Sequence, residues 1–294
     1  MSGLHPDDRI PVTASTKHMD YILRPYDPVV PPAGRLQPAS LLKHLLRHHG
    51  WLDEAWPVCE RLRDAVGHDE TVWGFKWGPK GTAIEFYYYN FTQNQQPNPV
   101  SFTSVRAALD GLLTFGVDVD ERSPYFMWSF EITPDGVRAK VADDPRIYLG
   151  SGDQARKTCG FSYHIAPDGI RMENHYWFYA PRVQKELDDV YGRLRYSPRA
   201  GTREAGRALV PNALERCHTI CYAVKPRADG LYFARITTPE LREWLRPKDP
   251  GLATMLTENA EDFAHLRWDL GFDFAGTPST THVDIHKYAV HGVF

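Results

Sequence analysis

The chain has no excess of charge of either sign and no long apolar run. Its 294 residues include 34 Lys and Arg against 37 Asp and Glu, for a formal net charge of −3. Without a basic field over the whole molecule, a protein that coats nucleic acid or a polybasic membrane-surface protein is disfavoured. No window reaches the roughly 20 apolar residues of a membrane span, and the first residues lack the charged-then-apolar order of a signal peptide. We therefore expect a cytoplasmic protein that binds neither nucleic acid nor membranes.

Cysteine and the common catalytic motifs are also scarce. Four cysteines are too few for a disulfide framework in a chain of this length, and no Cys-x-x-Cys pair is present. The sequence has no Gly-x-Gly-x-x-Gly, Walker, Gly-x-Ser-x-Gly or His-Glu-x-x-His motif, so nucleotide-dependent and common hydrolase chemistry has no support. Segments 143–147 and 188–192 begin with two aspartates but lack the third aspartate of a DDxxD motif, which disfavours classical terpene synthases.

Aromatic residues, in contrast, are abundant: 14 Phe, 8 Trp and 15 Tyr. Many stand in short apolar runs broken by turns that contain Asp-Gly or Pro-x-Gly, a pattern typical of β-hairpins. We predict hairpins at 71–91, 124–141, 157–179, 218–236 and 266–294. Amphipathic spacing predicts two helices in 39–66 and further helices at 102–115, 182–194, 203–216, 238–246 and 250–265.

This alternation of hairpins and helices predicts the fold class. One hairpin with its helix cannot bury its own apolar face, so a unit used five times must close on itself. We expect an α/β fold, a ten-stranded antiparallel β-barrel surrounded by helices, with an open α+β sheet as the alternative. Residues 1–38 carry seven prolines and are interpreted as an extended leader, and residues 39–294 as a single barrel domain.

Alternation along the second predicted strand indicates what faces the barrel interior. Successive side chains of a strand point to opposite faces. One face carries only Ile84, Phe86 and Tyr88, which suits contact with helices. The other carries Glu85, Tyr87 and Tyr89, a carboxylate among phenols, which suits a lumen.

From residue 71 to the end, the chain resembles the ABBA, or PT-barrel, aromatic prenyltransferases. The family's second strand has an acidic residue among aliphatic and aromatic neighbours, as at 84–86, and its sixth strand an inward Asn-x-Tyr pair, as at 174–176. Its basic strand residues are matched by Lys76 on the first strand, Arg138 or Lys140 on the fourth, Lys225 on the seventh and Lys287 on the tenth. The chain departs from the family pattern at Gly230, where a basic residue is expected.

The resemblance implies transfer of a prenyl group from an allylic diphosphate to an electron-rich aromatic molecule in secondary metabolism. The implied catalytic residues are Glu85 and Tyr176, the implied substrate-binding residues are Tyr87, Tyr89, Asn174 and Tyr232, and the implied diphosphate ligands are Lys76, Arg138, Lys140, Lys225 and Lys287. No cofactor is required, with Mg²⁺ as an optional one, since in some members the acid on the second strand helps to hold it. The partners are then a prenyl diphosphate and an aromatic acceptor, and the expected state is a monomer or weak homodimer.

Three alternatives stay open at this stage. A natural-product cyclase or other acid/base enzyme would use Glu85 on an aromatic substrate without diphosphate. A non-catalytic barrel would only bind a small molecule. A metal site would use His282, Asp284 and His286, which share one face of the last predicted strand.

Overall fold

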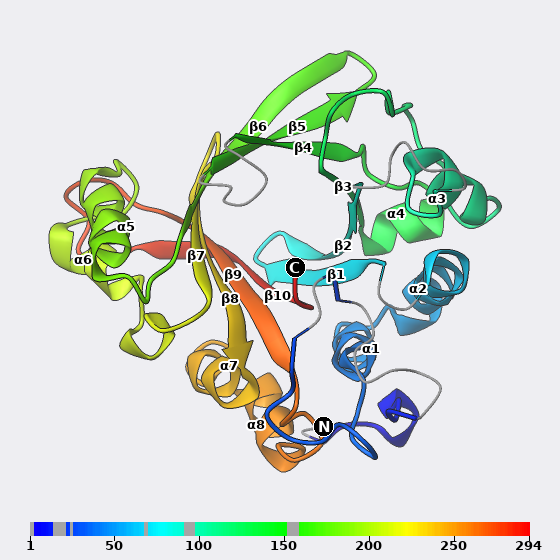
Figure 1. Ribbon diagram of the computed structural model, residues 1–294, viewed down its shortest axis with the longest axis horizontal. Helices are drawn as coiled ribbons and strands as arrows, with labels where there is room; N and C mark the ends of the chain where they lie inside the picture. The colour runs from blue at the N-terminus through cyan, green and yellow to red at the C-terminus, as the bar shows by residue number, and fades with distance from the viewer. Residues whose placement is uncertain (1–2, 14–21, 24–25, 68–69, 91–97, 152–158) are drawn as a thin grey trace.

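Ten antiparallel strands close into a barrel in the order β1-β10-β9-β8-β7-β6-β5-β4-β3-β2 (Figure 1). The computed structural model describes residues 3–13, 22–23, 26–67, 70–90, 98–151 and 159–294. The strands are β1 (Val72–Gly78), β2 (Gly81–Tyr89), β3 (Met127–Ile132), β4 (Arg146–Ser151), β5 (Cys159–Ala166), β6 (Gly169–Tyr179), β7 (Thr219–Val224), β8 (Asp229–Thr237), β9 (Arg267–Ala275) and β10 (Asp284–His291). Because β1 pairs with both β2 and β10, the sheet has no free edge. The predicted barrel is confirmed, and the open-sheet alternative is wrong.

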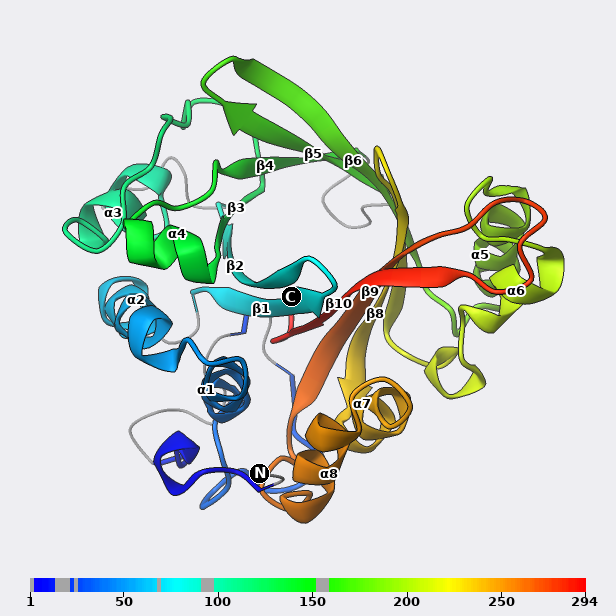
Figure 2. The ribbon, with the colours of Figure 1, turned by 180° about the vertical axis from the view of Figure 1, so that it is seen from behind.

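Helices surround much of the barrel. They are α1 (Pro38–His48), α2 (Leu52–Val66), α3 (Phe102–Ala108), α4 (Pro134–Ala139), α5 (Gln184–Tyr196), α6 (Arg203–Ala208), α7 (Thr238–Leu245) and α8 (Pro250–Glu258), with 3-10 turns η1 (Pro6–Asp8) and η2 (Asn212–Leu214). Figures 1 and 2 show them outside β1–β3 and β6–β9, whereas no described helix lies over β4 and β5. None of the described helices is long and apolar enough to cross a membrane.

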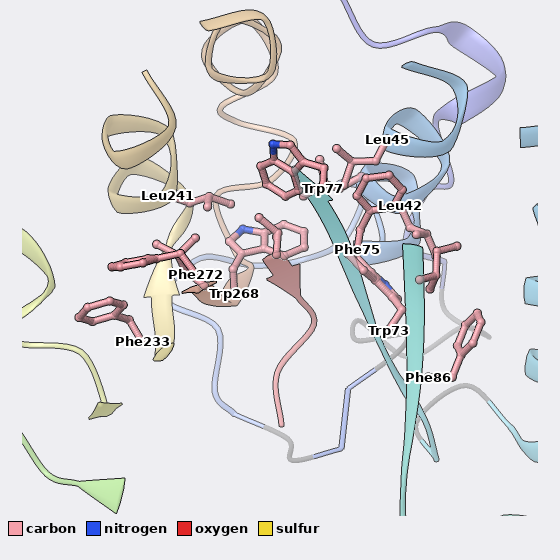
Figure 3. Close-up of a cluster of buried hydrophobic side chains, with 14 of the residues drawn as sticks. Leu42, Leu45, Trp73, Phe75, Trp77, Phe86, Phe233, Leu241, Trp268 and Phe272 are labelled. Carbon is pink, nitrogen blue, oxygen red and sulfur yellow. The ribbon is translucent and has the colours of Figure 1, made fainter. Parts of the chain in front are cut away.

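The outward side chains of the strands form the main core with these helices. On β1, the alternate residues Trp73, Phe75 and Trp77 are 0–9% exposed, and Figure 3 shows them beside Leu42 and Leu45 of α1. Burying a large apolar side chain contributes about 1.5–3 kcal/mol. The strand alternation thus assigns one face of each strand to the core and leaves the other face to line the barrel interior.

Four of the five predicted hairpins are confirmed. Segments 71–91, 157–179, 218–236 and 266–294 form the antiparallel pairs β1–β2, β5–β6, β7–β8 and β9–β10. The two helices predicted in 39–66 are α1 and α2. The other predicted helical stretches correspond to α3, α5, α6, α7 and α8; α5 is shifted by two residues from its predicted range, and the other four are shorter than predicted.

The hairpin predicted at 124–141 is wrong. Its first strand is β3, but the Thr-Pro-Asp-Gly that follows begins helix α4 instead of turning the chain back. The side chain of Thr133 caps this helix by accepting a hydrogen bond from the backbone N–H of Gly136 at 3.1 Å. In the similar segment 165–171, Ala166 stands where Thr133 would and has no side-chain acceptor, and there the chain does form a hairpin. The fourth strand therefore begins at Arg146, not near residue 138.

Part of the predicted leader, residues 1–38, lies outside the described residues. In the described part, η1 is anchored to α1, because Asp8 is fully buried and accepts hydrogen bonds from the Arg47 guanidinium at 2.8–3.1 Å. Pro11 and Leu36 form an isolated antiparallel bridge.

Candidate functional site

The side chains that point into the barrel are sorted by kind along its axis. Charged residues gather toward the β1–β2, β7–β8 and β9–β10 turns: Lys76, Glu131, Arg146, Lys225, Asp273 and Lys287. Apolar and aromatic residues gather toward the opposite end: Val72, Tyr87, Tyr89, Met127, Tyr148 and Phe294. Tyr176 and Tyr232 point inward and yet are partly exposed, so accessible space remains beside them. The interior has a charged end and an aromatic end.

Glu85 on β2 is the most completely hydrogen-bonded of the inward carboxylates. Its side chain is only 4% exposed. The donors to its two oxygens are the ammonium of Lys76, the hydroxyl of Ser129 at 2.5 Å, that of Tyr87 at 2.6 Å and that of Tyr148 at 3.2 Å. Burial alone would raise the pKa of Glu85, but the positive charges of Lys76 and Arg146 outweigh it and hold the pKa well below its usual value. Glu85 is therefore ionised at neutral pH.

Lys76 on β1 lies between two carboxylates. Its ammonium donates to Glu85 and to Glu131 of β3, and its side chain is 12% exposed. Burial would lower its pKa, but the two carboxylates reverse that effect and raise it. The pKa of Glu131 is lowered although burial opposes this, because Lys76 lies beside it. Lys76 is a permanent cation.

Arg146, the first residue of β4, adds a second cation to this side. Its Nε donates to Glu173 of β6 at 2.7 Å, and its side chain is 18% exposed. Burial opposes its charge, but Glu85, Glu173 and Glu131 raise its pKa further above the ordinary value. Its buried Nη1 has no hydrogen-bond acceptor among the described residues. Arg146 therefore adds a fixed positive charge to this side of the interior.

On the other side of the charged end, two lysines share one carboxylate. Lys225, which directly follows β7, donates to Asp273 Oδ1 at 2.6 Å and to the Tyr232 hydroxyl at 2.7 Å, while Lys287 of β10 lies 2.9 Å from Asp273 Oδ2. Burial and the charge of Lys287 lower the pKa of Lys225 to about 8. Burial would raise the pKa of Asp273, but the two lysines lower it to about 2. Lys225 is thus close to losing its proton at neutral pH, unlike Lys76.

A glycine makes room for this group. A Cβ at Gly230 would stand 2.9 Å from Asp273 Oδ1 and 3.2 Å from Lys225 Cε. Gly230 pairs with Asp273 across the β8–β9 ladder. The departure from the family pattern at this position therefore provides the space that the Lys225–Asp273 pair occupies.

Residues 291–294 pack against the aromatic end of the interior. The ring of Phe294 lies 4.6 Å from that of Tyr87, and its backbone N–H donates to Asp269 at 3.4 Å. Figure 1 shows this segment inside the ring of strands. His291 is buried beside it, with its pKa lowered to about 4 by burial and by Lys76, whereas burial raises the pKa of Asp269 to about 7.

The predicted pair on β6 points into the barrel and is hydrogen-bonded. Asn174 Nδ2 donates to the hydroxyls of Ser162 and Tyr176, each at 2.9 Å. The rings of Tyr176 and Tyr148 are 6.2 Å apart. These contacts fix the Tyr176 ring in the interior wall, next to the aromatic end.

Nine of the predicted site residues face this interior: Lys76, Glu85, Tyr87, Tyr89, Asn174, Tyr176, Lys225, Tyr232 and Lys287. Arg138 and Lys140 do not join them. Arg138 lies on α4, half exposed, and pairs with Glu54 and Asp135, while Lys140 donates to the carbonyl of Gly111. Their expected strand position is wrong because α4 replaces that strand.

Sequence reasoning missed several interior residues: Ser129, Glu131, Arg146, Tyr148, Asp269, Asp273 and His291. The Ser129–Glu131 alternation in 124–132 carried the signal for β3. Thr133, which caps α4, was the sequence signal that the fourth strand begins later, at Arg146. That strand includes Tyr148. Asp273 of β9 stands directly opposite Lys287 of β10 in the ladder, and opposite charges at such positions form cross-strand ion pairs.

The metal alternatives fit the structure poorly. His282, Asp284 and His286 are exposed, and among the described residues no group of three His, Cys, Asp or Glu side chains is arranged to hold a metal ion. Glu85, the acid linked to Mg²⁺ by resemblance, has both oxygens occupied by this chain's own donors. It does not fit the role of a Mg²⁺ ligand.

The comparisons with known proteins give likenesses of structure alone. No protein-family model matches the chain, and no curated protein matches it. The solved structure of AnaPT from Neosartorya fischeri is similar, with a TM-score of 0.45 and 9% sequence identity, over 86% of this chain and 91% of that chain.

Proposed function

We propose that the protein transfers a prenyl group from an allylic diphosphate to an electron-rich aromatic small molecule, of indole or phenol type, in secondary metabolism. One observation carries the proposal. Four cations, Lys76, Arg146, Lys225 and Lys287, gather at one end of a barrel whose other end is aromatic. Such an interior matches a ligand with an anionic head and an apolar, cation-forming tail.

The charged end would assist the first step. When the allylic carbon–oxygen bond breaks, its electron pair leaves with the diphosphate, and fixed cations stabilise that charge. Lys287 is 37% exposed, so its ammonium is available to a phosphate oxygen, and Arg146 adds a second positive charge from the interior wall.

The aromatic wall would assist the second step. Faces of Tyr87, Tyr89, Tyr176 and Tyr232 would stabilise the allyl cation and shield it from water. The acceptor ring donates a π pair to form the new carbon–carbon bond, and its ring proton must then leave. An arenium ion is a strong acid, so the Tyr87 hydroxyl could take that proton while it gives its own to Glu85, the ionised carboxylate to which it already donates.

We propose that no metal cofactor is required. The chain's own cations would do the work that Mg²⁺ does for a diphosphate elsewhere, and the oxygens of Glu85 are already occupied. Turnover should therefore persist in excess EDTA and should change little when Mg²⁺ is added.

A second candidate is favoured by the charge balance of the interior. The four cations face four carboxylates, Glu85, Glu131, Glu173 and Asp273, so the charged end is neutral overall. A neutral interior suits an uncharged aromatic substrate. A cyclase or other acid/base enzyme without diphosphate is therefore the alternative to test.

The experiment incubates the protein with dimethylallyl, geranyl or farnesyl diphosphate and a panel of indoles and phenols, and looks for a mass increase of one prenyl unit. Lys287→Ala should lose at least tenfold in kcat/KM for the donor, while Lys80→Ala, an exposed lysine of the β1–β2 turn, should not. No adduct, together with no binding of non-hydrolysable thiolodiphosphate analogues, would exclude the proposal. Aromatic binding without adducts would favour the cyclase or the non-catalytic barrel.

A further inference from the structure

Lys225 and Lys287 together form a site that could bind an anion. In this structure the carboxylate of Asp273 occupies the place between them. A carboxylate with an ammonium at 2.6 Å from one oxygen and another at 2.9 Å from its second oxygen has the surroundings that a phosphate oxygen pair would want. The group borders solvent, since Lys287 is 37% exposed and Asp273 10%. A ligand that approaches from the turn end meets these residues first.

We propose that Asp273 is an internal counter-anion which occupies the place of the donor's phosphate, and that binding of the donor requires Asp273 to give up its two ion pairs. The inference rests on the proposed function, because it names how that site selects its donor. Asp273 thereby sets the affinity for phosphate-bearing ligands.

The other carboxylates of the interior do not suit this role. Glu85 is held by three hydroxyl groups in addition to Lys76, so its release would leave several buried donors unpaired. Among the described residues, Asp273 has only the two ammonium groups and a distant hydroxyl, that of Tyr232 at 3.4 Å. An incoming phosphate would replace both ammonium contacts in kind.

The space around the pair also supports the exchange. Gly230 leaves no side chain beside Asp273 and Lys225, and a Cβ at this position would lie within 3.2 Å of both. Asp273 fills part of this space and lies between the two ammonium groups, where an anion would bind.

The test measures the binding of inorganic pyrophosphate by calorimetry at pH 6.0, where Lys225 keeps its proton. Asp273→Asn should bind about tenfold more tightly than the unaltered protein, because one negative charge within about 4 Å of the ligand is gone. Asp262→Asn, which removes a carboxylate paired with Arg9 outside the barrel, should bind like the unaltered protein. Asp273→Ser gives a second charge-removing variant if the first folds poorly.

A pH series separates this role from a structural one. The groups that face Lys225 are Lys287 of β10, Asp273 of β9, Tyr232 of β8, Cys221 of β7 and Lys76 of β1. Asp273 alone among them raises the pKa of Lys225. Pyrophosphate affinity should fall above about pH 8 in the unaltered protein, and this fall should begin at lower pH in Asp273→Asn.

The outcomes distinguish the two proposals. If Asp273→Asn and Asp273→Ser bind pyrophosphate no more tightly than the unaltered protein while prenyl adducts still form, the counter-anion role is wrong and the proposed function stands. If no variant binds pyrophosphate and no adduct forms, both are wrong. Tighter binding without any adduct would support the counter-anion role and exclude prenyl transfer to the acceptors tested.

Discussion

The two sides of the charged end use the same groups in opposite proportions. Around Lys76, one ammonium lies between two carboxylates, Glu85 and Glu131; around Asp273, one carboxylate lies between two ammonium groups, Lys225 and Lys287. The side chains of Lys76 and Lys225 are 12% and 13% exposed, so desolvation acts on both lysines. The neighbouring charges account for the difference in pKa. Two carboxylates raise the pKa of Lys76, whereas burial and the charge of Lys287 lower the pKa of Lys225 to about 8.

This difference separates a fixed side from a changeable one. The carboxylates around Lys76 stabilise its charge at every physiological pH, and the hydroxyl donors on Glu85 hold that side in place. Lys225 instead sits near its own titration and depends on one carboxylate. Ligand exchange and pH response are therefore expected at Lys225, and structural support at Lys76.

The largest effect should come from breaking the fixed side. Lys76→Met leaves Glu85 and Glu131 as buried carboxylates without their shared cation, which should lower the free energy of unfolding by about 3–5 kcal/mol at pH 7. Urea unfolding measures the loss, with Lys80→Met, an exposed lysine, as the control that changes it by less than about 0.5 kcal/mol. A loss below about 1 kcal/mol would show that Lys76 is not a structural cation.

The next effect concerns the pH dependence of the changeable side. Because the pKa of Lys225 is about 8 in the folded protein and 10.5 in the unfolded chain, the unfolded chain binds more protons in this window, and stability should rise with pH there. The contribution is about 3 kcal/mol at most. Urea unfolding at pH 8 and pH 10 should show this rise weakened in Lys225→Met. Equal slopes in both proteins would contradict the lowered pKa.

A smaller effect should follow from crowding the Tyr232 ring. A Cβ at Gly271 would lie 2.4 Å from Tyr232 Cδ1. Gly271→Ala should therefore lower the free energy of unfolding by about 1–3 kcal/mol and disturb the hydrogen bond from Lys225 to Tyr232. Gly192→Ala on α5 is the matched control, because no atom lies within 4 Å of its Cβ position and alanine favours helix. Thermal unfolding compares them; a neutral Gly271→Ala would mean that the ring shifts freely.

The smallest effect tests how firmly Glu85 is held. Tyr148→Phe removes one of its hydroxyl donors, and three donors remain, so stability should fall by about 1 kcal/mol. Tyr196→Phe on the exposed end of α5 should change nothing measurable. If Tyr148→Phe costs as much as Lys76→Met, the hydroxyl network and not the ammonium is the main support of the fixed side.

Much of the barrel could be predicted from sequence because its hairpins carry two independent local signals, alternation and turn residues. Glu85, Tyr87 and Tyr89 share a face by alternation alone, and the structure places that face inside. The error at 124–141 also has a local cause. Thr133 and Ala166 begin nearly the same Thr/Ala-Pro-Asp-Gly segment, and a hydroxyl that caps a helix decides between the two folds.

The ion pairs of the site could not be predicted in the same way. Lys225 lies just after β7, Asp273 on β9 and Lys287 on β10, and their contact depends on strand registers that no local sequence pattern reports. The sequence identifies each lysine separately, and the resemblance assigns each of them as a ligand for an anion. That each has a carboxylate partner, and that the partners differ in number on the two sides, follows only from the closed barrel.

Closure of the barrel has a further consequence for how the chain folds. The strands that seal it, β1 and β10, lie at residues 72–78 and 284–291, so this pairing joins segments more than 200 residues apart. Contacts of such sequence separation form slowly, because the intervening loop must be ordered first. During synthesis, β1 and its row of tryptophans therefore leave the ribosome long before their final partner exists, and that edge needs protection from other chains until β10 arrives.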